Sequence, residues 1–135
     1  MSELQRAGYS VEEMESSLVT ISNLATAAGV EYETATAGVV KVLSQYNLEA
    51  SDTSKVTNAM ASALANSTMT FEELVVGLGL TSNVASKFGY SVEEVSAALV
   101  ELTNAGYKSE DAGSYLKNIL LKLEKSFGNL DSLDV

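Results

Sequence analysis

At five points where the helical pattern of this 135-residue chain is interrupted, a residue that tolerates a left-handed backbone stands directly before an apolar one. At the end of an α-helix, such a residue takes the left-handed conformation and the next side chain folds back onto the last turn. The chain has no proline, so these pairs are its clearest helix stops. They are Gly8-Tyr9, Gly29-Val30, Asn47-Leu48, Gly89-Tyr90 and Gly106-Tyr107.

Helix starts follow several of these stops. Ser10, Thr70 and Ser91 each precede a glutamate by three residues, which is the pattern of a capping box. Weaker starts with an acidic first turn are Ser51-Asp52 and Ser109 to Asp111. Together the signals predict helices at about 10–28, 31–46, 51–66, 70–88, 91–105 and 109–126, with residues 2–7 ending an earlier one.

Apolar spacing supports the same interpretation. Within the predicted helices apolar residues recur three or four positions apart, as in Leu18, Ile21 and Leu24. Strands would need alternation, which only short runs near 39–40 and 74–80 permit. We therefore predict an all-α fold of about six helices, with residues 1–135 forming a single helical domain.

An internal repeat indicates how the helices are arranged. GYSVEEMESSLV at 8–19 returns as GYSVEEVSAALV at 89–100, with eight of twelve positions identical. Repeat-like units lie at about 8–29, 70–89 and 89–106, and each is a capped helix with a glycine stop. Such units predict stacked helical hairpins, and the small number of copies leaves a compact bundle as the alternative.

Four glycines fall inside predicted helices, where each costs about 1 kcal/mol relative to alanine. At Gly38 and Gly113 we expect close helix–helix approach to offset this cost. Gly77 and Gly79 make residues 76–82 the weakest helix and a candidate kink.

The residue types present exclude several kinds of active site and ligand. Without cysteine or histidine, the chain cannot form the usual zinc sites, thiol nucleophiles or Ser-His-Asp triads. A net charge of −10 disfavours nucleic acid, since that affinity depends on cations neutralising phosphates. The uncharged stretches at 16–30 and 56–71 are too short and polar to span a membrane. Half of the eight basic residues lie near the C-terminal end, namely Lys108, Lys117, Lys122 and Lys125.

Adjacent carboxylates are the only candidate catalytic pairs. Glycosidases need two carboxyl groups that face each other across the substrate. Here every pair lies in the first turn of a predicted helix, where capping and the helix dipole account for acidic residues. The pairs are Glu12/Glu13, Glu72/Glu73, Glu93/Glu94 and Glu110/Asp111. Asp131 to Asp134 lacks the spaced oxygens and turning glycine of a calcium loop. We predict no catalytic, cofactor-binding or metal-binding residue.

Tyrosines could stack on bases in a single-stranded nucleic-acid binder, but such a site also needs a basic groove. Three of the six tyrosines directly follow a glycine stop. We therefore interpret them as half-buried helix-cap contacts.

The order of several elements is more specific than any one of them. An apolar helix ending in Ala-x-Gly at 27–29 precedes YNLEAS at 46–51, and an Ala/Asn-rich helix leads into TFEEL at 70–74. A GYSVEE helix start at 89–94 is followed by Asn-Ala-Gly at 104–106. Over about residues 7–123 this order resembles the tape-measure proteins of long-tailed phages and prophages.

The resemblance implies a structural, non-catalytic component of the virion tail that is assembled in the host cytoplasm and helps to set tail length. Its implied partners are other tail proteins, namely the tube, the tail chaperones and the baseplate or tip, or further copies of itself. Tape-measure proteins are much longer, so the resemblance also implies an excised segment. The alternative from a different class is a cellular helical adaptor that presents a groove to partner helices.

The capping boxes provide a first test of these helix starts. Ser10→Ala, Thr70→Ala and Ser91→Ala should each lower the free energy of unfolding by about 0.5–2 kcal/mol, because a first-turn amide loses its acceptor. Urea titrations followed by circular dichroism measure the loss. Full stability in all three variants would mean that the predicted starts are misplaced.

Overall fold

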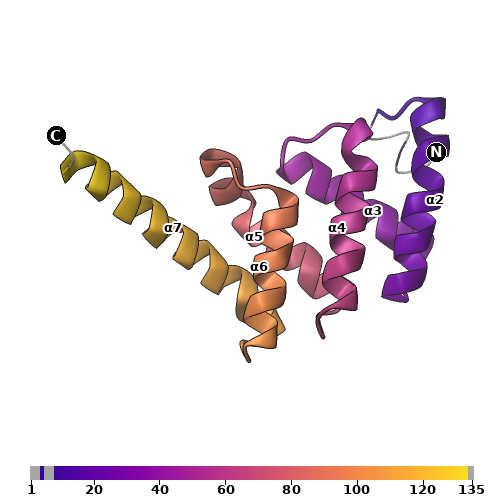
Figure 1. Cartoon of the computed structure of the whole chain (residues 1–135). Coiled ribbons are helices and arrows are strands. Elements are labelled where there is room, and N and C mark those ends of the chain that lie inside the picture. Colours follow the sequence, from indigo (N-terminus) through magenta and orange to yellow (C-terminus); the bar gives the residue numbers. More distant parts are fainter. Residues whose placement is uncertain (1–3, 5–7, 134–135) are drawn as a thin grey trace.

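Helices alternate between two layers along the chain (Figure 1). The computed structural model describes residue 4 and residues 8–133, with side chains up to residue 127. No strand occurs in these residues, so the predicted all-α fold is confirmed. The expected helix end at residues 2–7 lies outside them, apart from Leu4. The elements are α2 (Val11–Ala28), α3 (Tyr32–Gln45), the 3-10 turn η1 (Ala50–Asp52), α4 (Thr53–Ala65), α5 (Phe71–Phe88), α6 (Val92–Asn104) and α7 (Ser109–Leu133).

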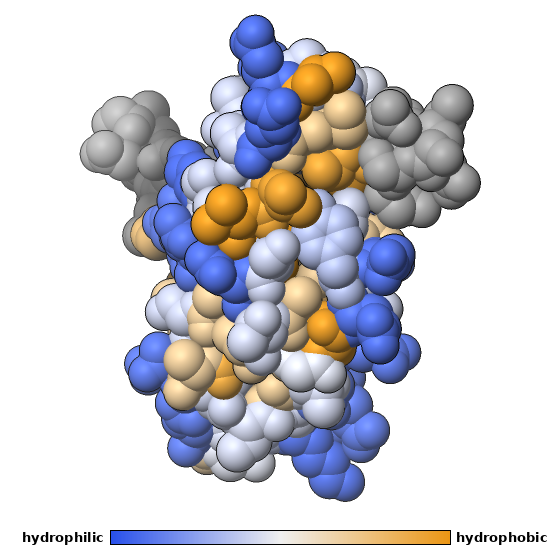
Figure 2. All heavy atoms as spheres, turned by 90° about the vertical axis from the view of Figure 1, so that its right-hand side faces the viewer, coloured by the Kyte–Doolittle hydropathy of each residue, from blue (hydrophilic) through white to orange (hydrophobic). Residues whose placement is uncertain are grey.

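One layer contains α2, α4 and α6, and the other contains α3, α5 and α7. Each helix contacts its neighbours in sequence and the adjacent helix of its own layer. Of the two arrangements that the sequence left open, the chain therefore forms a short stack of three hairpins, α2–α3, α4–α5 and α6–α7. The two copies of the twelve-residue repeat begin α2 and α6, which lie in the same layer. Figure 2 views the α2 end of the stack, where apolar side chains reach the surface between polar ones.

The five predicted helix stops are all confirmed. Each Gly or Asn has a positive φ, from 56° at Asn47 to 104° at Gly106. The amide of the following residue donates to the carbonyl five residues back, as the Schellman motif requires. These bonds are Tyr9 to Leu4 at 3.0 Å, Val30 to Ala25 at 3.0 Å, Leu48 to Leu43 at 2.8 Å, Tyr90 to Ala85 at 2.9 Å and Tyr107 to Leu102 at 3.1 Å.

The three predicted capping boxes are also present. In each, the hydroxyl accepts from the glutamate amide at 3.1 Å and the glutamate accepts from the cap amide at 2.9 Å. At α4 the start differs from the prediction, because Asp52 accepts from the Glu49 amide at 2.9 Å and a 3-10 turn precedes the helix. The last helix is longer than predicted: α7 continues through Gly128 to Leu133 instead of ending at residue 126.

Two glycine contacts set the spacing between helices of the second layer. A Cβ on Gly38 of α3 would lie 2.6 Å from Cζ of Phe71, and one on Gly113 of α7 would lie 2.8 Å from Cα of Gly77. The expected close approach is therefore confirmed at Gly38 and Gly113. The weak segment expected at 76–82 lies inside α5, which is unbroken. Gly77 serves there as the surface against which Gly113 packs.

Apolar side chains between the two layers form the core, and buried tyrosines connect it across helices. Tyr46, at the end of α3, donates to the Leu78 carbonyl of α5 at 2.9 Å. Burial raises the pKa of Tyr46 to about 12, so its hydroxyl stays protonated as a donor. Tyr9 shares a 2.6 Å hydrogen bond with Thr53 at the start of α4.

Replacing single glycines in α5 and α7 tests the packing of these helices. Gly113→Ala should lower the free energy of unfolding by about 1–3 kcal/mol, since the new methyl meets the backbone of Gly77. The matched control is Gly79→Ala, whose methyl would meet the amide end of Gln45 at 3.1 Å. A side-chain end can move, so this variant should keep its stability or gain up to about 1 kcal/mol of helix propensity. Equal losses in urea unfolding would contradict the proposed backbone contact.

Candidate interaction groove

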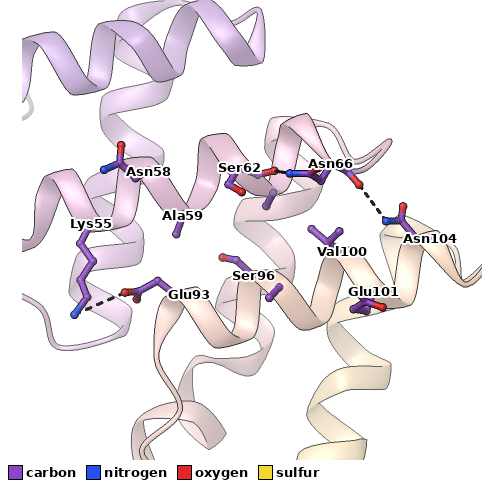
Figure 3. Close-up of a pocket in the computed structure, with 12 residues that line it drawn as sticks. Lys55, Asn58, Ala59, Ser62, Asn66, Glu93, Ser96, Val100, Glu101 and Asn104 are labelled. Atoms are coloured by element: carbon purple, nitrogen blue, oxygen red, sulfur yellow. Dashed lines mark hydrogen bonds and ion pairs between the residues drawn. The ribbon is translucent and has the colours of Figure 1, made fainter.

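A groove of about 700 Å³ runs between α4 and α6 (Figure 3). Most of the residues that line it are small or uncharged. Ala59, Ser62, Ala97 and Val100 lie along the groove, and asparagines lie toward both ends. Two contacts connect the walls. Lys55 Nζ lies 3.8 Å from a Glu93 carboxylate oxygen near one end, and Asn104 Nδ2 donates to the Asn66 carbonyl at 3.1 Å near the other.

One buried hydroxyl of this groove has no hydrogen-bond partner among the described residues. Ser96 of α6 is 3% exposed, and its Oγ makes no hydrogen bond among the described residues. Burial of an unpaired hydroxyl costs about 1–3 kcal/mol. The acidic residues of the groove, Glu93 and Glu101, both belong to α6, so no carboxylate faces them from α4. The groove therefore lacks the opposed acids of a glycosidase.

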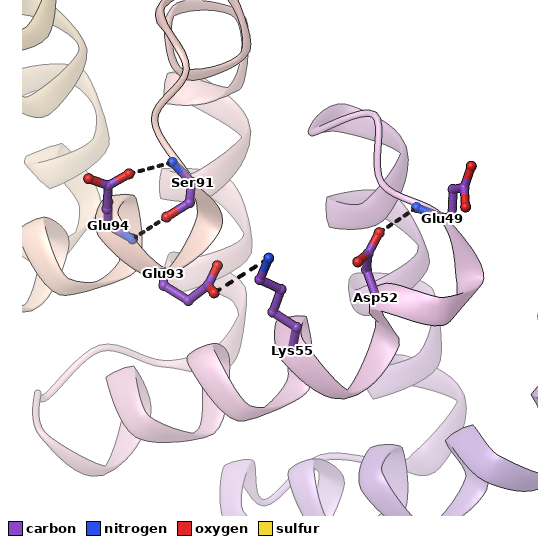
Figure 4. A network of polar contacts seen from close by, with 6 residues as sticks. All are labelled: Glu49, Asp52, Lys55, Ser91, Glu93 and Glu94. Carbon is purple, nitrogen blue, oxygen red and sulfur yellow. Dashed lines mark hydrogen bonds and ion pairs between the residues drawn. The ribbon is translucent and has the colours of Figure 1, made fainter.

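Four of the eight members of the predicted carboxylate pairs make local contacts in the structure. Glu13, Glu73 and Glu94 each accept from a cap amide, and Glu93 pairs with Lys55 (Figure 4). The side chains of that ion pair are about half exposed, so the pair contributes little to stability. Glu13, Glu73 and Glu94 thus serve as the predicted caps, and Glu93 lies at the surface.

One acidic grouping could not be inferred from the sequence. The first turns of α5 and α7 lie together, so Glu72, Glu73 and Glu110 line a shallow pocket of about 350 Å³. Glu73 already serves as a cap. No group of three potential ligands within the described residues is suited to hold a metal ion. Contact between the two helix starts depends on the stacking of α5 and α7, which no local motif encodes.

The tyrosines do not form a common stacking surface. Tyr9 and Tyr46 are buried, and the Tyr90 hydroxyl donates to Glu124 of α7 at 2.9 Å. This bond to a carboxylate raises the pKa of Tyr90. The rings of Tyr107 and Tyr115 meet edge to face at 5.0 Å. Tyr107 is 47% exposed, close to the half-buried contact expected of it, whereas Tyr9 is more deeply buried than expected.

None of the described helices is both long and apolar enough to cross a membrane.

Comparison with known proteins gives the chain its family context. The profile of the phage-related minor tail protein family matches residues 1–132. A tape measure protein of Pneumococcus phage Dp-1 is 26% identical over 125 residues. The alignment covers 93% of this chain and 11% of that protein, so the chain spans about one tenth of the relative's length. No solved structure matches the chain.

The adjacent acids of α6 test whether these carboxylates serve structure. Glu94→Ala should cost about 0.5–1 kcal/mol of stability, because it opens a capping box, whereas Glu93→Ala should cost less than about 0.5 kcal/mol. Both substitutions replace a glutamate by alanine in the same helical turn, so they change helix propensity by the same amount. A difference in stability between the two variants therefore reports the loss of the cap. A larger loss at Glu93, measured by urea unfolding, would contradict the assignment of Glu94 as the cap.

Proposed function

Because the chain belongs to the phage-related minor tail protein family, we propose that it is a non-catalytic segment of a tape measure protein that helps to determine tail length during assembly. The match over residues 1–132 carries this proposal, since it spans nearly the whole chain. A structural role in a phage tail follows from the family itself. With the family established, the adaptor alternative has no observation in its favour.

The chemistry of the chain supports a role without catalysis. Without cysteine or histidine, only carboxylates, hydroxyls, amines and amides could react. The glutamates of the capping boxes are held by backbone amides, and the groove between α4 and α6 has acids on one wall alone. These arrangements support surfaces for assembly in preference to a site for substrate turnover.

The partners we propose are other tail components: the tube, the tail chaperones and the baseplate or tip. The proposed location is the virion tail, after assembly in the host cytoplasm. The acidic surface supports packing among proteins in preference to direct contact with DNA, because phosphates repel a chain of net charge −10.

We further propose that residues 1–135 act as one folded domain of the parent protein. A continuous helix of this length would extend about 200 Å at 1.5 Å per residue. A compact domain of the same length has a radius of gyration of about 14 Å. The stack of three hairpins supports the compact form, so the segment should contribute little length of its own to a molecular ruler.

The length of the tail after deletion of this segment tests whether the segment is compact or extended in the parent protein. An in-frame deletion of residues 7–123 from the parent phage protein should block the start of assembly or shorten tails by far less than about 175 Å, the length of the deleted residues as one helix. Electron microscopy of the virions measures the length, with a Glu93→Gln phage as the control for normal tails. Intact tails shortened by nearly 1.5 Å per deleted residue would show that the segment is extended inside the tube.

A further inference from the structure

Gly77 of α5 contacts both helices of the third hairpin. Gly113 of α7 packs against its backbone, since a Cβ on Gly113 would lie 2.8 Å from the Gly77 Cα. Leu99 of α6 covers the same glycine, because a Cβ on Gly77 would lie 3.2 Å from Cδ1 of Leu99. Both helices of the α6–α7 hairpin therefore meet α5 at a residue without a side chain, which gives the hairpin a smooth point on which to turn.

In the other layer, the groove between α4 and α6 separates the same two hairpins. Polar contacts cross it at its two ends, where Lys55 pairs with Glu93 and Asn104 donates to the Asn66 carbonyl (Figure 3). Among the described side chains, no hydrogen bond crosses the middle of the groove. The second and third hairpins are thus in backbone contact on one side of the stack and about 700 Å³ of open space lies between them on the other.

The two end contacts hold the walls of the groove together only weakly. The side chains of Lys55 and Glu93 are about half exposed, and water screens such a pair. Asn66 and Asn104 are exposed, so water can replace the hydrogen bond between them. Breaking both contacts therefore changes the free energy of the chain little.

The buried hydroxyl of Ser96 disfavours the closed groove. Its side chain lies on the side of α6 that faces α4 (Figure 3), and its Oγ has no partner among the described residues. The buried hydroxyls of Thr57 and Ser82, in contrast, donate to carbonyls of their own helices. A wider groove admits water to Ser96, and the hydroxyl then gains the hydrogen bonds that it lacks.

We propose that the α6–α7 hairpin turns on Gly77, so that the groove between α4 and α6 opens and closes. The closed form is the one described, with both end contacts made and Ser96 shielded from water. In the open form these contacts are broken, Ser96 is hydrated, and the stack curves more strongly toward the layer of α3, α5 and α7. Every residue involved lies between 55 and 113, so the proposal depends neither on neighbouring segments of a parent protein nor on the role in tail-length determination.

The reactivity of an introduced thiol measures the opening, because the chain has no cysteine of its own. Ser96→Cys places a thiol on the groove, and Val95→Cys places a similarly buried thiol on the core side of the same helix. Iodoacetamide should modify Ser96→Cys at least about tenfold faster than Val95→Cys, whose thiol reacts only when α6 unfolds. Adding Lys55→Ala and Asn104→Ala should speed the reaction of Ser96→Cys by about threefold or more relative to that of Val95→Cys.

A distance measurement tests the same motion without a buried cysteine. Spin labels at Ala65→Cys and Ala105→Cys lie on exposed positions of α4 and α6 outside the groove. Double electron–electron resonance should resolve two distances for this pair, and Lys55→Ala with Asn104→Ala should shift the population toward the longer one. The control pair, Asn23→Cys with Ala65→Cys, spans α2 and α4 and should give one distance that the two alanine substitutions leave unchanged.

Two results would overturn the proposal. Equal reaction rates for Ser96→Cys and Val95→Cys would mean that the groove opens only when α6 unfolds. A single distance across the groove, unchanged by the two alanine substitutions, would mean that the third hairpin does not turn. Circular dichroism of every variant ensures that folded proteins are compared.

Discussion

The fold depends on the left-handed turn that ends its helices. At each of five positions a Gly or Asn with positive φ lets the next amide bond to a carbonyl five residues back. This bond satisfies one of the last carbonyls of the helix and reverses the chain within a few residues. Four of the described helices, α2, α3, α5 and α6, end at such a turn. They are 13–18 residues long, a length that is marginal for an isolated helix. Their stability therefore has to come from packing against one another.

Packing in the second layer is limited by backbone contact. Gly113 meets Gly77, and Gly38 receives the Phe71 ring, so α3, α5 and α7 approach more closely than alanine would allow. This closeness also shapes the surface, because it brings the first turns of α5 and α7 together around the acidic pocket. Each glycine lowers the helix propensity of its own segment, and the closer dispersion contact between helices offsets this loss of stability.

Features that depend on local signals could be predicted from the sequence, and features that depend on packing between distant segments could not. Stops and capping boxes were predictable because each involves atoms within six residues, as in the reciprocal bonds of Ser91 and Glu94. Gly77 was misjudged as a weak point, since its role appears only when Gly113 of another helix lies against it. The end of α7 was placed at about residue 126, whereas the helix continues through Gly128 to Leu133. The groove was missed because its walls, α4 and α6, meet only through the layer arrangement.

Most of the buried side-chain hydroxyls among the described residues have a hydrogen-bond partner. Buried hydroxyls bond to carbonyls of their own helices, as Thr36 does to Tyr32 and Thr81 to Gly77, and Tyr46 bonds across to Leu78. Groups used in this way are not available for proton transfer or nucleophilic attack. Surface that could contact other proteins remains in the groove between α4 and α6 and in the exposed apolar side chains of α2 and α7. These are surfaces, which suits the structural role of a phage-related minor tail protein.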